Sequence, residues 1–244
     1  MFEVNPACEV TAIVDIGPDN RSAMVIDNFY ENPHEIRKLA LDLPRSKKIH
    51  FTNHHSGLRA ALDTLEVRKG VSRILFELLS DHEHWGRTTD MAFIEKNMQY
   101  MWFLVDFINE DSITEEPLRL LPFQCYYEHN PSPFQFTIDI FLNEEKECFG
   151  GINAWNFAGK TSIVEDVKNM YADKGKFDIM KDVYNSKFTW SREFTFGMKF
   201  NRAVIIPADM LISPILNTGK FTDVDRIVQT VSYTHLTLPT SDLV

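Results

Sequence analysis

The sequence predicts an α+β fold in which a helical N-terminal part, up to about residue 118, precedes a β-sandwich or barrel. The first observation is the order of patterns: amphipathic helical segments come first, and short strand-like segments follow from about residue 119 to about residue 230. Helices and strands segregated in this way are typical of an α+β domain. The second is the count of 19 phenylalanines in 244 residues, because aromatic rings favour a β-rich interior.

Composition and charge narrow the class of protein. Hydrophobic residues make up 44% of the chain and charged residues 25%, as in ordinary globular proteins with a substantial core. The net charge of −10 argues against a basic surface that binds nucleic acid. No apolar run is long enough to span a membrane, and the start of the chain lacks the regions of a signal peptide. We therefore expect a cytoplasmic protein without nucleic-acid or membrane partners.

The cysteines indicate reduced thiols. Cys8, Cys125 and Cys148 are odd in number and irregularly spaced, unlike a disulfide framework. They also lack the Cys-x-x-Cys spacing of a zinc site. Cys125 and Cys148 are expected to pack as small apolar residues.

A helix is predicted from Pro33 up to Pro44, which ends it. Asn32 is a good N-cap, Pro33 suits the first helical position, and Glu35 follows the cap as in a capping box. The apolar residues on one face are Ile36, Leu39, Ala40 and Leu43. Helical spacing of apolar residues predicts further helices at 70–80, at 89–109 and within 162–186.

Short strands are predicted where β-forming residues or alternating patterns are bounded by turn residues. The predicted strands are 9–16, 22–28, 136–142, 188–200, 202–206, 210–216 and 225–233. Residues 46–59 are instead predicted to be an irregular loop, and residues 110–118 a charged connector. The chain contains no internal repeat or linker-like segment, so we expect a single domain over residues 1–230.

Two groups of histidines invite a metal assignment. His50, His54 and His55 lie in the predicted loop without a neighbouring carboxylate. The His-Glu-His run at 82–84 has a spacing that chelates only from a strand. Ligand-spacing rules therefore favour solvated loop residues over a metal site in both cases.

The stretch from Phe123 to Phe157 carries a clean sheet pattern. It comprises a strand, a loop with a histidine, a second strand, a charged hairpin, a Gly-Gly pair and a third strand. In the second strand, Phe136, Ile138, Ile140 and Leu142 alternate with Gln135, Thr137, Asp139 and Phe141. This alternation predicts a strand with two distinct faces, around which the rest of the barrel is expected to be built.

Six segments occur in the order and spacing of a known family. They are VIDNFYENPHEIRKLAL at 25–41, SGLRA at 56–60, HNP at 129–131, FLNEEKECFGGINAW at 141–155, NRAVIIPADMLISP at 201–214 and DRIVQT at 225–230. Together they resemble the 2-oxoglutarate/Fe(II)-dependent oxygenases, in the prolyl-4-hydroxylase-like branch of phages and bacteria. The resemblance implies a double-stranded β-helix, a jelly-roll or cupin-like barrel with N-terminal flanking helices. It also implies Fe(II) and 2-oxoglutarate as cofactors, and hydroxylation of a peptide or a small metabolite.

The resemblance also implies the residues of a site. The family holds Fe(II) with two histidines and one carboxylate, and an arginine pairs with the distal carboxylate of 2-oxoglutarate. His129 stands at the first histidine and Arg226 at the cosubstrate arginine. The carboxylate position falls on Pro131 and the second histidine position on Ile212, and neither side chain can bind a metal. Two of the three iron ligands are therefore absent at the matching positions.

Two carboxylates are candidates to replace the missing ligand. Asp139 lies on the strand after His129, and Asp209 lies near the turn before Ile212. Two hypotheses stay open on this evidence. One is an oxygenase, and the other is an inactive barrel without a cofactor that serves as a binding or structural module.

Simpler roles also fit the two matched residues. His129 is interpreted as a hydrogen-bonded loop histidine if it binds no metal. Arg226 is interpreted as half of an ion pair with Asp223 or Asp225 if it binds no cosubstrate.

The segment 231–244, VSYTHLTLPTSDLV, resembles the translation of a sequencing-library adapter. We therefore interpret it as a non-native tail and leave it, with His235, outside the predicted domain. The native chain is expected to differ beyond Thr230.

Overall fold

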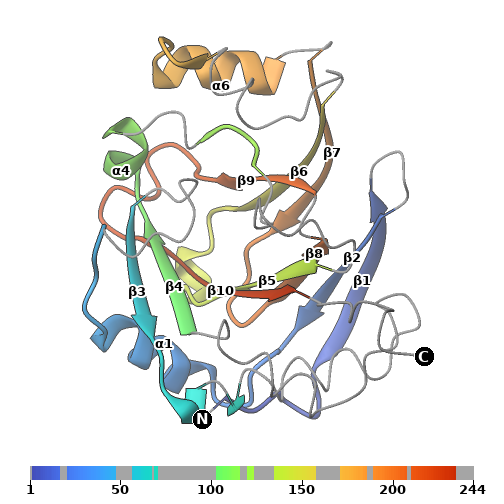
Figure 1. Ribbon diagram of the computed structural model, residues 1–244, viewed down its shortest axis with the longest axis vertical. Coiled ribbons are helices and arrows are strands. Elements are labelled where there is room, and N and C mark those ends of the chain that lie inside the picture. The colour runs from blue at the N-terminus through green and yellow to red at the C-terminus, as the bar shows by residue number, and fades with distance from the viewer. Residues whose placement is uncertain are drawn as a thin grey trace, which may run out of the picture.

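A computed structural model describes residues 2–16, 21–47, 57–67, 69–70, 103–115, 120–123, 135–157, 171–185, 189–207 and 210–234. These residues form two antiparallel β-sheets with helices around them (Figure 1). The larger sheet has the strand order β1-β2-β8-β5-β10-β4-β3, and the smaller sheet has the order β7-β6-β9. The predicted β-rich core with flanking helices is confirmed at this level.

The elements have the following bounds. The larger sheet contains β1 (Glu9–Ile16), β2 (Arg21–Asp27), β3 (Leu58–Leu62), β4 (Phe103–Ile108), β5 (Gln135–Phe141), β8 (Ala203–Pro207) and β10 (Arg226–Thr234). The smaller sheet contains β6 (Gly151–Phe157), β7 (Trp190–Gly197) and β9 (Leu211–Ile215). The described helices are α1 (Pro33–Asp42), α4 (Glu110–Glu115), α6 (Lys176–Asn185) and the short 3-10 helix η4 (Glu145–Glu147).

The two sheets lie face to face. Phe141, Val204 and Val228 of the larger sheet share one buried apolar cluster with Ile152 and Ile212 of the smaller sheet. In Figure 1 the layers follow from top to bottom as α6, the smaller sheet, the larger sheet and α1. The space between the sheets is therefore the interior of a sandwich or barrel.

Each sheet is covered by a helix on its outer face. Ile36 and Ala40 of α1 are buried in a cluster with the outer face of the larger sheet. Ile179 and Val183 of α6 are buried in a cluster with Trp155 on the smaller sheet. Burial of apolar side chains on both sides explains why these helices hold their places.

Strand β5 shows how both faces of the larger sheet are used. Ile138 and Ile140 belong to the cluster under α1. Phe141 belongs to the cluster between the sheets, so Asp139, two residues earlier, lies on that same inner face. The alternation predicted from the sequence is confirmed, but its polar positions point into the protein.

The prediction of a helix over residues 89–109 is wrong for its last part. Phe103, Val105 and Phe107 are fully or almost fully buried on one face of strand β4, and this spacing of two is that of a strand. Strand pairing with β3 and β10 decides the conformation. The N-terminal part is thus not mainly helical where it is described, because it contributes strands β1 to β4. Residues 89–102 lie outside the described residues.

Two predicted irregular segments contain regular structure. The connector 110–118 contains helix α4, which is capped because the Asn109 side chain accepts a hydrogen bond from the Ser112 N–H at 2.9 Å. The loop 46–59 ends in strand β3, which starts at Leu58. Helix α4 depends on its cap, and strand β3 depends on pairing with the distant strand β4. The pattern of apolar residues alone reveals neither.

Helix α1 begins at Pro33, as predicted. The capping box is wrong, because the Asn32 side chain makes no cap hydrogen bond. Its carbonyl oxygen instead accepts from the Glu35 N–H at 3.2 Å and the Ile36 N–H at 3.4 Å. Proline at the first position thus sets the helix start without a side-chain cap.

Several expectations fall outside the described residues. They are the helix at 70–80, the histidines at 50–55 and 82–84, and the loop that carries His129 and Pro131. Strand β10 continues through residues 231–234, which pair with β5. The non-native origin of the segment 231–244 stays a prediction.

Two further expectations concern membranes and thiols. None of the helices in the described ranges is both long enough and apolar enough to cross a membrane. Cys8 and Cys148, the cysteines in that part of the chain, are not joined in a disulfide.

Candidate functional site

A row of polar side chains, four of them ionisable, crosses the inner face of the larger sheet. It consists of Arg59 on β3, Asp106 on β4, Asp139 on β5, and Arg226 and Thr230 on β10, and all five are buried. The strand register places Arg59 opposite Asp106 and Asp139 opposite Thr230. Buried charges are rare unless they are paired or bind a ligand. This row is therefore the candidate site.

The first pair in the row is satisfied internally. Arg59 Nε lies 2.6 Å from Asp106 Oδ1, and Arg59 Nη2 lies 2.8 Å from Asp106 Oδ2. This two-point geometry is the strongest form of an Arg–carboxylate contact. The pair supports the site as a neutral unit.

Asp139 is a buried carboxylate on the adjacent strand. The Thr230 hydroxyl donates to Asp139 Oδ1 at 2.9 Å. Burial raises the pKa of Asp139 from 3.8 to about 6, although the positive charge of Arg226 and the Thr230 hydrogen bond act in the opposite direction. The Asp139 side chain points into the space between the sheets, which is a condition for it to replace the missing iron ligand. Its role in binding a metal stays a prediction.

We expect Asp139→Asn to remove a pH-dependent destabilisation. The folded-state pKa of about 6 lies above the ordinary 3.8, so the folded protein holds a proton longer than the unfolded chain. The destabilisation by Asp139 is absent below pH 3.8, and the free energy of unfolding of the wild type falls as the pH rises from 3.8 to about 6. The stability of Asp139→Asn relative to wild type should rise by about 2 kcal/mol between pH 4.5 and pH 7.5. Urea unfolding at several pH values tests this, and parallel profiles would contradict it.

Arg226 is the least satisfied member of the row. Its Nη2 donates to the Gly151 carbonyl oxygen at 3.1 Å, and its guanidinium carbon lies 5.6 Å from the centre of the Phe141 ring. In the described part of the chain, its Nε has no hydrogen-bond partner although it is buried. Burial lowers the pKa of Arg226 to about 10, while Asp139 and Asp106 act to raise it. At neutral pH the guanidinium is charged.

The alternative ion pair for Arg226 is not formed with Asp225. The Asp225 carboxylate lies 2.8 Å from Arg45 Nη1 and accepts from Asn109 Nδ2 at 3.0 Å. Asp223 is exposed. Arg226 instead lies on the inner face of β10, where it faces the smaller sheet.

Gly150 and Gly151 explain how the smaller sheet comes within reach of Arg226. A Cβ atom on Gly151 would lie 2.1 Å from the Phe196 carbonyl oxygen, and one on Gly150 would lie 2.3 Å from the Ile215 carbonyl oxygen. Only glycine allows these close approaches of the backbone. The pair fixes the start of β6, where the Gly151 carbonyl oxygen accepts the hydrogen bond from Arg226.

Gly151→Ala should therefore destabilise the fold by at least about 2 kcal/mol, because the new methyl group collides with a backbone carbonyl. Gly197→Ala is the matched control, since Gly197 is exposed, lies opposite Gly151 on β7, and a Cβ there meets nothing within 4 Å. That control should change the free energy of unfolding by less than about 0.5 kcal/mol. Urea unfolding of both variants measures the difference, and equal effects would refute the packing argument.

The iron-ligand positions do not form a described metal site. Ile212 is buried in the apolar cluster between the sheets, and its backbone pairs with Phe123. Its side chain offers no metal donor, as the sequence indicated. His129, Pro131 and Asp209 lie outside the described residues. Within the described ranges, no group of three His, Cys, Asp or Glu residues could hold a metal ion.

The Arg59–Asp106 pair is the part of the site that the sequence-based prediction missed. A signal was present, because Asp106 interrupts the apolar run FLVDFI at 103–108. A charge within a buried strand indicates an internal partner. Arg59 as that partner follows only from the pairing of β3 with β4.

No family model matches the sequence, and no curated protein matches it. Among solved structures, the chain is similar to an N-substituted L-amino acid dioxygenase from Burkholderia ambifaria AMMD, with 12% identity and a TM-score of 0.43, over 88% of this chain and 82% of that chain. It is also similar to HygX from Streptomyces hygroscopicus with nickel and 2-oxoglutarate bound, with 9% identity and a TM-score of 0.40, over 88% of this chain and 83% of that chain. At these values neither likeness carries an argument for a site or an activity in this chain.

Proposed function

We propose that the chain is an oxygenase-like barrel whose interior binds a small dicarboxylate of the 2-oxoglutarate type at Arg226. The observation that carries this proposal is the buried guanidinium between the sheets, whose Nε has no hydrogen-bond partner among the described residues. A buried donor without a partner destabilises a protein by about 1–3 kcal/mol, and by more when it is charged. A ligand carboxylate would satisfy this donor.

The chemistry of Arg226 suits a carboxylate better than other ligands. A guanidinium offers parallel N–H donors that match the two oxygens of a carboxylate. Asp139 and Asp106 lie close enough to affect its pKa, but the two-point contact of Asp106 is made with Arg59. A carboxylate ligand would therefore meet a cation that is only partly neutralised.

The order of strands supports the double-stranded β-helix. Along the chain, β4 lies in the larger sheet, Phe123 bridges to β9 in the smaller sheet, and β5 returns to the larger sheet. Strands β6 and β7 then belong to the smaller sheet, β8 to the larger, β9 to the smaller and β10 to the larger. Strands that pass between two facing sheets in this way are the feature of a jelly roll.

The iron of the oxygenases does not fit the residues present. The second histidine position is the apolar Ile212, and the carboxylate position is Pro131. A single imidazole at His129 gives weak and unselective binding of a divalent metal. We therefore favour the binding module over the hydroxylating enzyme.

Calorimetric titration of the metal-free protein with 2-oxoglutarate tests the proposal. We expect saturable binding with a Kd in the range of ~1 μM to 1 mM that is usual for metabolite sites. The 5-methyl ester, in which the distal carboxylate is masked, should bind far more weakly. Absence of binding by 2-oxoglutarate would refute the proposal.

An anaerobic titration with Fe(II) and 2-oxoglutarate separates the two functions. The binding module predicts no visible metal-to-ligand charge-transfer band and no oxygen-dependent succinate. A band accompanied by succinate formation would establish the oxygenase instead.

A further inference from the structure

We propose that Asn143 is a positioning residue that fixes Arg226 for ligand binding. The proposal rests on the proposed function, because it assigns Asn143 a role only through the carboxylate bound at Arg226. Asn143 follows strand β5 and is completely buried.

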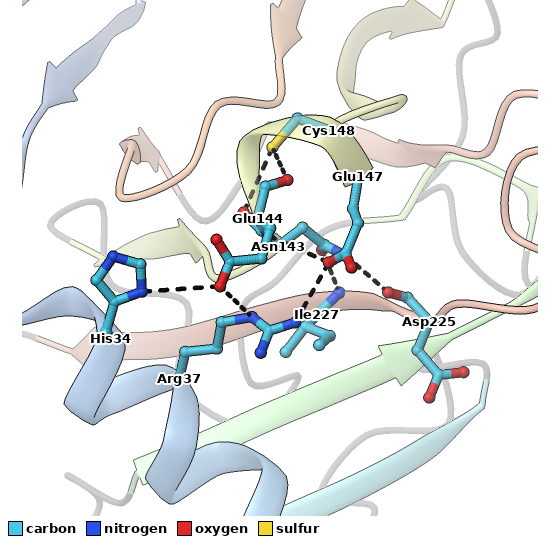
Figure 2. A network of polar contacts seen from close by, with 8 residues as sticks. All are labelled: His34, Arg37, Asn143, Glu144, Glu147, Cys148, Asp225 and Ile227. Carbon is cyan, nitrogen blue, oxygen red and sulfur yellow. Dashed lines mark hydrogen bonds and ion pairs between the residues drawn. The ribbon is translucent and has the colours of Figure 1, made fainter.

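The Asn143 side chain holds the backbone on both sides of Arg226. Its Nδ2 donates to the Asp225 carbonyl oxygen at 2.8 Å, and its Oδ1 accepts from the Ile227 N–H at 2.7 Å. Figure 2 shows the dashed lines that run from the side chain of Asn143 to these two residues. One amide thus satisfies a polar backbone group on either side of Arg226.

Further contacts fix the same piece of backbone. The Leu142 N–H donates to the Ile227 carbonyl oxygen at 3.0 Å. On the other side of Arg226, the Asp225 carboxylate is held by Arg45 and Asn109. The start of β10 is therefore fixed by the loop after β5 and by residues from earlier in the chain.

The segment between β5 and β6 is not the predicted hairpin, because the two strands belong to different sheets. It is a loop that contains η4, and it is anchored on helix α1. Arg37 Nη2 lies 3.3 Å from Glu147 Oε2, and Arg37 Nε lies 3.6 Å from Glu144 Oε1. His34 Nδ1 lies 3.7 Å from the same Glu144 oxygen. Glu144 and Glu147 also cap η4 reciprocally. Figure 2 shows these side chains converging above α1, so that Asn143 acts from a fixed support.

The side chain of Arg226 has few restraints of its own. Its described hydrogen bond is the one to Gly151, and its Nε has no partner in that part of the chain. The direction of the guanidinium therefore depends on where the backbone places its Cα atom. A fixed backbone removes part of the ordering penalty that a ligand would otherwise meet on binding.

Two substitutions test the role of Asn143, with 2-oxoglutarate as the calorimetric probe. Asn143→Ala should weaken binding by about 10-fold at pH 7.5, at the lower end of the 10–100-fold losses that follow removal of residues that orient the side chains of a metal site. Asn143→Asp restores both hydrogen bonds when its carboxyl is protonated, and it loses the donor when ionised. Relative to wild type at each pH, Asn143→Asp should bind weakly at pH 7.5 and regain affinity as the pH is lowered and its carboxyl takes up a proton.

The matched control is Asn201→Gly. Asn201 is also buried, and its amide bonds both the N–H and the carbonyl oxygen of Tyr30, at 2.8 and 2.9 Å. Glycine keeps the positive φ of 61° at this position. Asn201→Gly should lower the melting temperature much as Asn143→Ala does, and leave the Kd for 2-oxoglutarate unchanged.

The outcomes separate the two proposals. If wild type does not bind 2-oxoglutarate, the proposed function fails, and the role of Asn143 fails with it. If wild type binds and substitution of Arg226 abolishes binding, but both Asn143 variants bind normally, the positioning role alone is overturned. An affinity of Asn143→Asp that does not vary with pH relative to wild type also overturns it.

Discussion

Arg226→Met is expected to weaken the binding of 2-oxoglutarate by about 100-fold, because a charge-assisted hydrogen bond contributes about 1.5–3 kcal/mol and the substitution removes the donors of such bonds. The Met side chain keeps much of the apolar length of the arginine, so the change acts mainly on charge and hydrogen bonding. Isothermal titration calorimetry at pH 7.5 measures the loss directly.

The same substitution should change stability much less than affinity. Among the described residues Arg226 makes no ion pair within salt-bridge distance, and its Nε is buried without a hydrogen-bond partner, so removing the guanidinium also removes a desolvation penalty that these residues do not offset. Arg226 also acts to lower the pKa of Asp139, so the substitution should move that pKa higher than about 6. The loss of affinity would therefore not reflect unfolding, and circular dichroism and melting curves of the variant would show this.

Arg202→Met is the matched control for Arg226→Met. It removes the same charge, but Arg202 pairs with Asp27 at 2.6 Å, in an ion pair that does not include the row between the sheets. Its affinity for 2-oxoglutarate should equal that of wild type. If both arginine variants bind normally, or if both lose binding equally, Arg226 is not the carboxylate site.

The sequence indicated where Arg226 lies in the order of segments, but not what surrounds it. Local patterns carried the prediction of α1 and β5, because Pro33 and the alternation in 136–142 are local signals. The prediction of a helix over residues 89–109 was wrong at strand β4, because the apolar residues of this segment have near-helical spacing. The structure of β4 is determined instead by pairing with β3 and β10, which are distant in the sequence. The same long-range pairing brings Arg59 to Asp106, and no local pattern reveals such a pair.

The contacts of Asn143 show a similar limit. Its place after β5 is visible in the sequence, within the segment FLNEEKECFGGINAW. Its two hydrogen bonds reach residues more than 80 positions away, with sequence separations of 82 and 84. Only the register between β5 and β10 brings the Asn143 amide to the backbone on both sides of Arg226.

The second large effect is expected from Arg59→Met, which should destabilise the fold by about 3–5 kcal/mol because it leaves the carboxylate of Asp106 buried without its guanidinium. Both side chains are almost fully enclosed, with exposed fractions of 3% and 6%. A domain of this size has a total stability of about 5–15 kcal/mol. Urea unfolding at pH 7.5 should therefore show a large fall in the midpoint, and the variant will be marginal at higher temperature.

Two companion measurements distinguish a lost charge partner from lost packing. In Arg59→Met, the loss of the Arg59 guanidinium has a cost only while the Asp106 carboxylate is ionised, so the penalty should decline as the pH falls and the carboxylate takes up a proton. The double variant Arg59→Met/Asp106→Leu removes both charges and should recover most of the lost stability, since an apolar pair avoids the desolvation of ions. A packing defect would leave the loss of stability unchanged at low pH and in the double variant. An unchanged loss in either measurement would refute the ion-pair explanation. Recovery in the double variant would show that an uncharged pair at these two positions stabilises the larger sheet about as well as the ion pair does.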